Sequence, residues 1–159
     1  MKFKLDEVDH KILDLLIDNS RIPFTDIAKK LLISAGTVHV RVKKMEEFGL
    51  IKGASLALDY KKLGYTFIAY IGIFLEKTHL TNYVLDKLES IPYTTVAHIT
   101  TGRFNIFCKV RCKDTDHAKE IIFMIDDIEG VSRTETMISL EESINDKKRL
   151  MHKIFNEIK

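Results

Sequence analysis

The chain has 159 residues, of which 45% are hydrophobic and 30% charged, as expected for a soluble protein of one or two small domains. Its formal net charge of +2 is too small for a general polyanion binder, so an anionic partner would have to meet one local surface. No apolar run approaches the ~18 residues of a membrane span, and Met1–Lys4 lacks the apolar stretch of a secretory signal. We therefore expect a cytoplasmic protein with no membrane partner.

Helical periodicity before Gly49 predicts three helices. Asp6 is the expected N-cap of the first helix. The apolar side of this helix is formed by Leu5, Val8, Ile12, Leu15 and Leu16. Residues 26–51 then predict two helices joined by a tight turn at Leu32 and Ile33, with a basic second helix. This pattern is typical of a helix-turn-helix, and it predicts a DNA-binding, winged-helix-like domain over residues 1–50.

The second helix of the helix-turn-helix has separate buried and exposed faces. Ser34 is its expected N-cap, and Gly49 follows its end, where a left-handed residue is favoured. At about 100° per residue, the buried stripe consists of Ala35, Val38, Val42 and Met45. Between residues 29 and 44 there are five Lys or Arg residues and no Asp or Glu. Duplex DNA fits such a focused basic surface.

We expect this surface to make two kinds of DNA contact. Groove-facing side chains set sequence preference, and basic side chains that reach phosphates set affinity and salt dependence. The base-edge set is Thr37, His39, Val40 and Lys44, and the phosphate set is Lys29, Lys30, Arg41 and Lys43. Gly36 permits close approach, and Ser34 lies at the end of the helix that faces DNA. The alternative is an ordinary solvated helix face formed by Lys43, Lys44, Glu46 and Glu47.

After Gly49 the periodicity changes to short alternating runs. We predict a hairpin linker over residues 51–65, including a turn at 59–64. The elements expected next are a strand at 66–75, a helix at 80–91, strands at 94–100 and 104–112, a helix at 115–128 capped at Thr115, and a strand at 131–140. This βαββαβ order is the ferredoxin-like arrangement, so the predicted fold class is α+β. The second domain is expected over residues 66–159, with a C-terminal helical tail.

Both faces of the expected strand at 66–75 are apolar. Because the two helices of a ferredoxin-like unit cover one face of the sheet, the other face needs a partner, most simply the same sheet of a second copy. Such a dimer would place two recognition helices on successive major-groove turns, about 34 Å apart. The alternative cover is the C-terminal segment. Its amphipathic stripe consists of Leu150, Met151, Ile154, Phe155 and Ile158.

The cysteines and histidines give no sign of a metal site or cofactor. Cys108 and Cys112 lie on the apolar face of one expected strand, about 13 Å apart, which is too far for a disulfide within that strand. We expect both to be buried, reduced thiols. The six histidines show no zinc-ligand spacing. We therefore predict no metal, no cofactor and no catalytic residues.

Long runs of the chain resemble the Lrp/AsnC, or feast-famine, family of transcription regulators. They are LDEVDHKILDLLIDNSR at 5–21, ISAGTVHVRVKKMEEFGLIKG at 33–53, TTGRFNIFCKV at 100–110 and RTETMISL at 133–140. Within the family they look closest to the asparagine-responsive AsnC branch. Two departures stand out. Leu32 occupies the turn where the family usually has Gly, so the turn must do without a residue that tolerates positive φ. Asn105 stands where many relatives have Asp.

The resemblance implies an effector pocket in the loop between the second and third strands, at a contact between dimers. Backbone amides near Gly102 can approach a carboxylate, the Asn105 amide can satisfy a side-chain amide, and Glu135 can supply a negative charge to an ammonium. The alternative for Gly102 is simple hairpin geometry. The full expected set is Thr100, Thr101, Gly102, Arg103, Phe104, Asn105, Thr134, Glu135 and Thr136.

The resulting prediction is a sequence-specific DNA-binding transcription regulator controlled by a small amino acid, with asparagine favoured. We expect a dimer that assembles further into a tetramer or octamer, with the amino acid favouring one arrangement. One alternative is a ligand-independent architectural protein that coats DNA. Another is a haem-precursor decarboxylase of the same architecture, with His98 and Arg103 as working residues. Against the enzyme, the sequence shows no nucleophile with a paired base.

Overall fold

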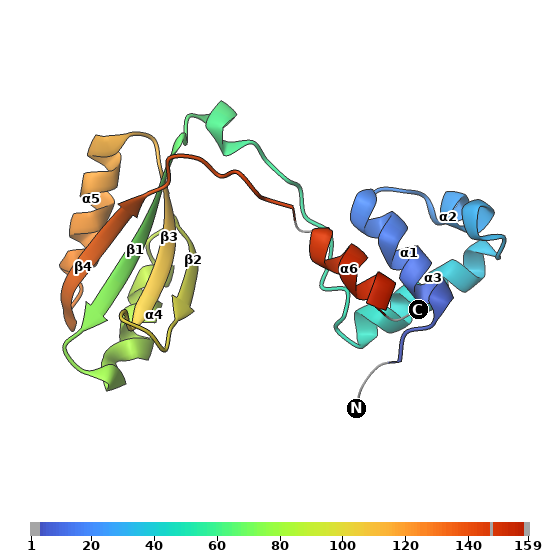
Figure 1. The fold of residues 1–159 in the computed structure, drawn as a ribbon, viewed down its shortest axis with the longest axis horizontal. Coiled ribbons are helices and arrows are strands. Elements are labelled where there is room, and N and C mark those ends of the chain that lie inside the picture. The colour runs from blue at the N-terminus through green and yellow to red at the C-terminus, as the bar shows by residue number, and fades with distance from the viewer. Residues whose placement is uncertain (1–3, 147, 158–159) are drawn as a thin grey trace. The chain divides into compact units, whose positions relative to one another are not determined.

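The computed structural model describes residues 4–146 and 148–157. The chain divides into two compact units. The helical unit comprises Met1–Ala57 with Ile144–Lys159, and the sheet unit comprises Leu58–Ser143 (Figure 1). Within the described residues, no helix has both the length and the apolar character that a membrane crossing requires.

The helical unit contains the predicted helix-turn-helix. Its helices are α1 (Glu7–Asp18), α2 (Phe24–Leu31), α3 (Ala35–Glu47) and α6 (Arg149–Glu157). The first three bury their apolar stripes against one another. Buried side chains from them are Ile12, Leu13, Ile27, Ala28, Val38, Val42 and Met45. The stripe predicted for α3 is confirmed at Val38, Val42 and Met45, while Ala35 is only partly buried. Burial of this side turns the opposite side of α3 to solvent.

Local hydrogen bonds set the limits of α1 and α3 as predicted. The Asp6 carboxylate accepts the Asp9 backbone N–H at 2.9 Å, and the Asp9 carboxylate accepts the Asp6 N–H at 3.1 Å, which makes a capping box. The Ser34 hydroxyl accepts the Thr37 N–H at 3.0 Å. Gly49 follows α3 with φ +78°, the left-handed conformation that ends a helix with least strain in glycine.

The turn between α2 and α3 does contain a residue with positive φ, and that residue is Leu32. Its φ is +57°, and its side chain is 93% exposed, so packing does not offset the strain of the left-handed conformation. We expect Leu32→Gly to raise the unfolding free energy of the helical unit by about 0.5 kcal/mol, after the greater freedom of unfolded glycine is subtracted. Leu32→Val should lower it by about 1 kcal/mol. Urea unfolding of the two variants measures both effects, and equal stabilities would contradict this reading of the turn.

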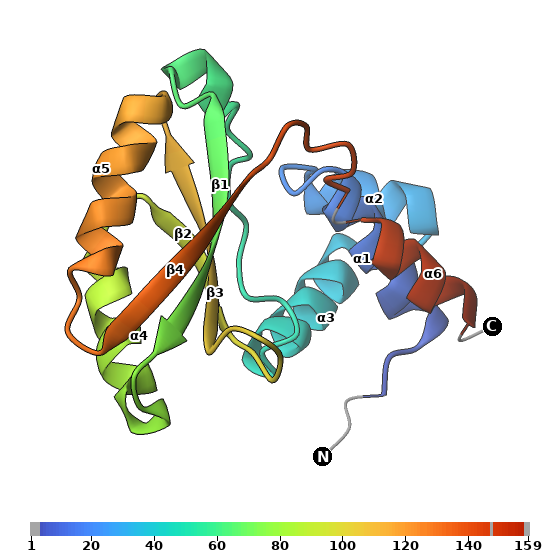
Figure 2. The same cartoon turned by 60° about the vertical axis from the view of Figure 1, so that its left-hand side comes forward.

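The C-terminal helix α6 packs on the helical unit beside α1 (Figures 1 and 2). Phe155 is 8% exposed and stacks on His10, with ring centroids 5.0 Å apart. The His152 ring lies 2.8 Å from the Asp14 carboxylate. The structure therefore groups the tail with the first domain, whereas the sequence placed it in the second. Met151, Ile154 and Phe155 of its stripe meet the helical core, and Ile158 lies outside the described residues.

The linker contains the predicted turn but no hairpin. Residues 52–59 form neither helix nor strand, whereas the turn predicted at 59–64 is confirmed as a 3₁₀ turn at Tyr60–Leu63. Leu56 and Leu58 are 68% and 55% exposed, so the segment has no buried face to fix a strand register. An isolated two-stranded hairpin is at best marginally stable in water, and this one would have had no core to pack on.

The sheet unit confirms the predicted α+β, βαββαβ order. The elements are β1 (Phe67–Leu75), α4 (Thr81–Glu89), β2 (Thr94–Ile99), β3 (Ile106–Cys112), α5 (Thr115–Asp126) and β4 (Val131–Ile138), with a 3₁₀ turn at Thr78–Leu80. The strands lie in the order β2-β3-β1-β4, and each neighbouring pair is antiparallel. Helices α4 and α5 cover the same side of the sheet (Figure 2). One cap differs from the prediction, because Asp114 rather than Thr115 accepts the His117 N–H, at 2.8 Å.

The core between sheet and helices includes the two cysteines. Cys108 and Cys112 are buried free thiols, as predicted. Burial raises the pKa of each thiol to about 11. Both therefore stay protonated at neutral pH and serve as core side chains.

Candidate nucleic-acid interface and effector loop

The side of α3 away from the core is solvent-exposed and carries the predicted DNA contacts. The exposed members of that set are Lys29, Lys30, Ser34, Gly36, Thr37, His39, Val40, Lys43 and Lys44. Two lysines lie near acidic residues at long distances, with Lys29 3.9 Å from Asp26 and Lys43 3.8 Å from Glu47. Exposed pairs of this kind are weak, so both ammonium groups can move to a phosphate at little cost.

The beginning of α3 is held by side chains of the same set. The Ser34 and Thr37 hydroxyls are 2.8 Å apart and share a hydrogen bond. His39 packs edge-to-face against Phe24 of α2, with ring centroids 6.1 Å apart. These contacts fix the Thr37 and His39 side chains, so this exposed part of α3 is already ordered.

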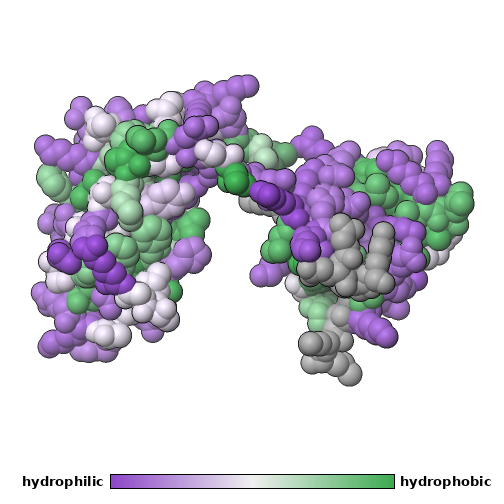
Figure 3. All heavy atoms as spheres, in the orientation of Figure 1, coloured by the Kyte–Doolittle hydropathy of each residue, from purple (hydrophilic) through white to green (hydrophobic). Residues whose placement is uncertain are grey.

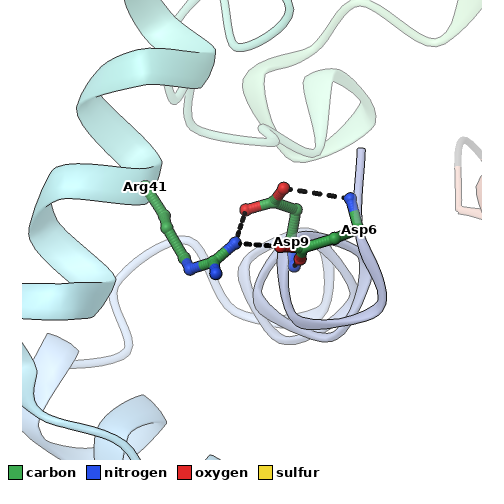
Figure 4. Close-up of polar contacts among 3 residues, drawn as sticks. All are labelled: Asp6, Asp9 and Arg41. Atoms are coloured by element: carbon green, nitrogen blue, oxygen red, sulfur yellow. Dashed lines mark hydrogen bonds and ion pairs between the residues drawn. The ribbon is translucent and has the colours of Figure 1, made fainter. Parts of the chain in front are cut away.

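Arg41 is placed differently from the other bases. Its Nη1 donates to Asp6 Oδ2 at 2.6 Å and to Asp9 Oδ1 at 2.7 Å, which ties α3 to the first turn of α1 (Figure 4). The Arg41 side chain is 28% exposed. The hydrogen bond from the Asp9 backbone and the bond from Arg41 lower the pKa of Asp6, and the two carboxylates raise the pKa of Arg41. A phosphate contact by Arg41 stays a prediction, and it now has to be compatible with these two ion pairs.

The lowered pKa of Asp6, caused first by the Asp9 backbone hydrogen bond and then by Arg41, makes the stability of the helical unit depend on acid pH. Since the folded state favours ionised Asp6, its stabilisation is complete well above the ordinary pKa of 3.8 and is lost as pH falls through the lower folded-state value. The Asp6–Arg41 pair is partly exposed, so we expect about 1 kcal/mol or less. Asp6→Asn keeps an N-cap residue but removes the titrating carboxylate. In urea unfolding, the variant should therefore lack this part of the difference in unfolding free energy between pH 7 and pH 3. An unchanged pH dependence would show that Asp6 contributes nothing through its charge.

A hollow lies between the start of α1 and α3. It is lined by Lys4, Asp6, Asp9, Ser34, Gly36, Thr37, Val40, Arg41 and Lys44. Sequence analysis assigned the α3 members to DNA contact but missed Lys4, Asp6 and Asp9. The only signal available was Asp6 as a helix cap, because periodicity cannot show that α1 starts next to α3.

The loop between β2 and β3 contains the predicted effector residues. The Thr100 hydroxyl donates to the Phe104 carbonyl, and the Thr100 N–H donates to the Asn105 carbonyl at 3.1 Å. Gly102 has no positive φ, and a Cβ there would meet nothing within 4 Å. Hairpin geometry therefore does not require glycine at this position, which weakens the structural alternative for Gly102. Thr101, Gly102 and Arg103 are exposed.

Two predicted polar partners are already engaged within the chain. The Asn105 Oδ1 accepts the Leu75 N–H at 3.0 Å, so its amide NH₂ is the part that can meet a ligand. Glu135 lies 2.6 Å from Arg103 and 3.4 Å from Arg133. With two guanidinium groups this close, Glu135 is not the unpaired acceptor that the sequence suggested for an ammonium.

The last-strand residues do not share one face of the sheet. Thr134 and Thr136 pair with core-facing β1 residues, and the Thr134 hydroxyl donates to Asp126 of α5 at 2.7 Å. Glu135 pairs with Gly72 and lies on the face without helices. Because side chains alternate along a strand, the structure does not bring all three together.

The sheet face without helices carries a row of aromatic rings, which confirms the apolar second face predicted for the strand at 66–75 and adds Phe104 and Phe107 to it. We call this row, Tyr70, Phe74, Phe104 and Phe107, the aromatic row. Phe104 is central to it, with centroids 5.2 Å from Phe74 and 5.8 Å from Phe107, and Tyr70 stacks on Phe107 at 5.8 Å. Arg133 lies 3.9 Å above the Phe74 ring. Elsewhere on the sheet unit, apolar residues reach the surface among hydrophilic ones (Figure 3).

Gly72 makes room for this row. A Cβ at Gly72 would lie 2.4 Å from the Phe104 ring, closer than real Cβ contacts allow. Phe104 belongs to the loop between β2 and β3, so the absence of a side chain at Gly72 lets the Phe104 ring set the position of that loop.

The residues between 4 and 157 that the structure describes contain no group of three or more His, Cys, Asp or Glu able to hold a metal ion.

Both units match known protein families. Residues 5–52 match the family described as winged helix-turn-helix DNA-binding. Residues 68–148 match the family described as Lrp/AsnC ligand binding domain. Regulatory protein AsnC of Escherichia coli K12 is 38% identical over 143 residues, covering 89% of this chain and 94% of that protein. AsnC of Haemophilus influenzae is 38% identical over 141 residues, with coverages of 88% and 94%.

Solved structures give the same result. The structure of E. coli AsnC matches with a TM-score of 0.87 and 36% identity, over 91% of this chain and 97% of that one. A transcriptional regulator from Neisseria meningitidis, solved as a complex with L-Met, has a TM-score of 0.85 at 18% identity, over 91% and 95%, and shows the shared fold. The sequence relatives described above are named as regulatory proteins, which agrees with the prediction that this protein is not an enzyme. The chain belongs to the Lrp/AsnC family of DNA-binding transcription regulators.

Proposed function

We propose that α3 is the recognition helix of this regulator and that a small amino acid bound to the sheet unit controls its activity. The observation that carries the first part is the exposed, basic side of α3. This helix is capped at Ser34, is followed by Gly49, and lies in a unit that matches the winged helix-turn-helix family. The second part is supported by the match of the sheet unit to the Lrp/AsnC ligand binding domain.

The proposed DNA contacts keep the division drawn from the sequence. Thr37, His39, Val40 and Lys44 face base edges, and Lys29, Lys30 and Lys43 contact phosphates. Gly36 adds no side chain, so the backbone of α3 can come close to the duplex, and Ser34 orders the end of the helix that enters the groove. Arg41 completes the proposed phosphate set.

The salt dependence of DNA binding separates these roles. Lys43→Ala should weaken binding to all duplexes alike and reduce the slope of log K against log salt by about 0.9, the value for one phosphate contact. Lys44→Ala should also change which duplex is preferred. Lys87→Ala in α4 is the matched control and should change neither quantity. If the Lys43 and Lys44 variants behave like the control, α3 is not the recognition helix.

Asparagine is the effector that we propose. Support comes from the AsnC relatives and from a neutral amide at Asn105, which can pair with a side-chain amide. The Neisseria regulator is a complex with L-Met, so the family fold accommodates a free amino acid. The loop set, including Thr100, Thr101, Gly102, Arg103 and Phe104, remains the proposed site, with Glu135 beside it through its ion pair with Arg103. Thr134 and Thr136 lie on the other face of the sheet and leave the proposed set.

Thermal unfolding against each of the twenty amino acids tests this assignment. A ligand that binds only the folded protein raises its stability by mass action, by about 2.7 kcal/mol at a hundredfold excess over Kd. A shift with asparagine alone supports it. A rise in unfolding temperature with a different amino acid would identify that amino acid as the effector in place of asparagine. No rise with any of the twenty would indicate ligand-independent, architectural DNA binding.

We also propose that the aromatic row is the surface through which two copies associate, with further assembly of dimers into a tetramer or octamer. Met137, which pairs with Tyr70 on this face, is 44% exposed. Exposed apolar surface next to an aromatic row is typical of a protein–protein interface. Sedimentation of Met137→Asp should show a smaller species than the unaltered chain, whereas Phe123→Asp on the exposed side of α5 serves as the control.

A further inference from the structure

We infer that Asp6 and Asp9 are positioning residues for DNA recognition, which hold Arg41 so that its outer N–H groups meet a DNA phosphate. The inference rests on the proposed function of α3. It assigns a role in binding to two carboxylates that simple electrostatics would count as unfavourable next to DNA.

The geometry leaves donors on Arg41 for a further acceptor. Both bonds to the carboxylates, at 2.6 and 2.7 Å, are donated by Nη1. An arginine has five N–H groups in a planar fork, so Nη2 and Nε keep donors for another anion. Arg41 lines the same hollow as Thr37 and Lys44, two of the proposed DNA contacts. A phosphate that reaches this hollow finds the outer edge of the guanidinium.

The carboxylates are themselves fixed before DNA arrives. Each accepts the backbone N–H of the other residue, so the first turn of α1 sets where both lie. The Asp9 side chain is only 10% exposed. Arg41 is therefore ordered during folding, and the loss of its rotamer freedom does not oppose DNA binding. A long arginine without these partners would have to be ordered by the phosphate alone.

Charge and position predict opposite effects when one carboxylate is neutralised. Removing a negative charge beside a DNA-binding surface should strengthen binding if only long-range electrostatics matter. Removing a carboxylate that orients Arg41 should weaken binding if the inference is right. Asp9→Asn separates the two, since asparagine keeps a side-chain carbonyl that can accept the Asp6 N–H of the capping box.

The experiment is a double-mutant cycle on DNA affinity, measured by fluorescence anisotropy with a labelled duplex bound by the unaltered protein. Circular dichroism at the assay temperature verifies that each variant is folded. We expect Asp9→Asn to weaken binding roughly tenfold, the size of one charge-assisted hydrogen bond. Glu7→Gln is the matched control, because Glu7 lies in the same turn of α1 and pairs with Lys11 at 2.7 Å. It should leave affinity unchanged or slightly higher.

The Arg41→Ala background completes the cycle. There, Asp9→Asn should no longer weaken binding, because the side chain that it positions is absent. Arg41→Lys should not restore affinity, since one ammonium cannot reach two carboxylates and a phosphate in the same planar geometry. Additive effects of the two changes, or Asp9→Asn binding as tightly as Glu7→Gln, would overturn the inference.

A second variant protects the test from failure to fold. Asp6→Asn retains an N-cap residue and removes the other partner of Nη1, so it should weaken binding in the same direction. If Asp6→Asn and Asp9→Asn both bind as tightly as the unaltered protein, the inference is wrong while the proposed function stands. If the unaltered protein binds no duplex at any salt concentration, the proposed function fails, and the inference fails with it.

Discussion

Replacing Phe155 by alanine is expected to lower the unfolding free energy of the helical unit by about 3 kcal/mol. Phe155 is 8% exposed, stacks on His10 and packs with the core of the helix-turn-helix. Removing its ring leaves a cavity between α1 and α6. A helix as short as Arg149–Glu157 has little stability of its own, so it depends on this contact.

Hydrogen exchange of core amides in α1 and α3 measures this loss within the helical unit alone. Leu150→Ala is the control, because Leu150 lies on the same helix but is 66% exposed. It should change stability by less than about 0.5 kcal/mol. Equal protection in the Phe155 and Leu150 variants would mean that α6 does not stabilise the helix-turn-helix.

A side chain at Gly72 is expected to have a large effect on the sheet unit. Gly72→Ala places a Cβ 2.4 Å from the Phe104 ring, so the ring must move or β1 must shift. Overpacking of this kind costs about 2 kcal/mol. Because Phe104 belongs both to the loop that we propose as the effector site and to the aromatic row, we expect the amino-acid response and self-association to weaken together.

Two variants test whether the clash itself is the cause. Gly102→Ala lies in the same loop, where a Cβ meets nothing within 4 Å, and it should leave chemical unfolding of the sheet unit nearly unchanged. Phe104→Ala in the Gly72→Ala background removes the ring that the new methyl group meets. Phe104→Ala should therefore lower the unfolding free energy less in this background than it does in the unaltered protein. Independent, additive costs would exclude the proposed contact.

The sequence was sufficient for the helix-turn-helix because its rules are local. Ser34, Gly49 and the stripe of α3 each act within four or five residues. Both caps lie where they were predicted, as do Val38, Val42 and Met45 of the stripe. The βαββαβ order followed from alternation and helical spacing in the same way. The assigned N-cap of α5 missed by one residue, since Asp114 and Thr115 are both good caps and only the backbone shows which one turns out of the helix.

The remaining differences depend on contacts between distant parts of the chain. The partners of Arg41 lie 32 and 35 residues away, and those of Glu135 include Arg103, 32 residues away. No periodicity shows such pairs. The stripe of α6 was visible, but a stripe does not identify the surface that it covers. Because side chains alternate along a strand, the sequence itself indicates that Glu135 lies on the opposite face from Thr134 and Thr136. The predicted effector set wrongly combined all three.

The most direct test of the whole account is selection of DNA from a random duplex pool by the full chain, with and without asparagine. We expect enrichment of one sequence with two half-sites about 10 base pairs apart, matching two recognition helices, and a changed yield when asparagine is present. Retention of an unselected pool to the same extent in both conditions would contradict a sequence-specific, amino-acid-controlled regulator.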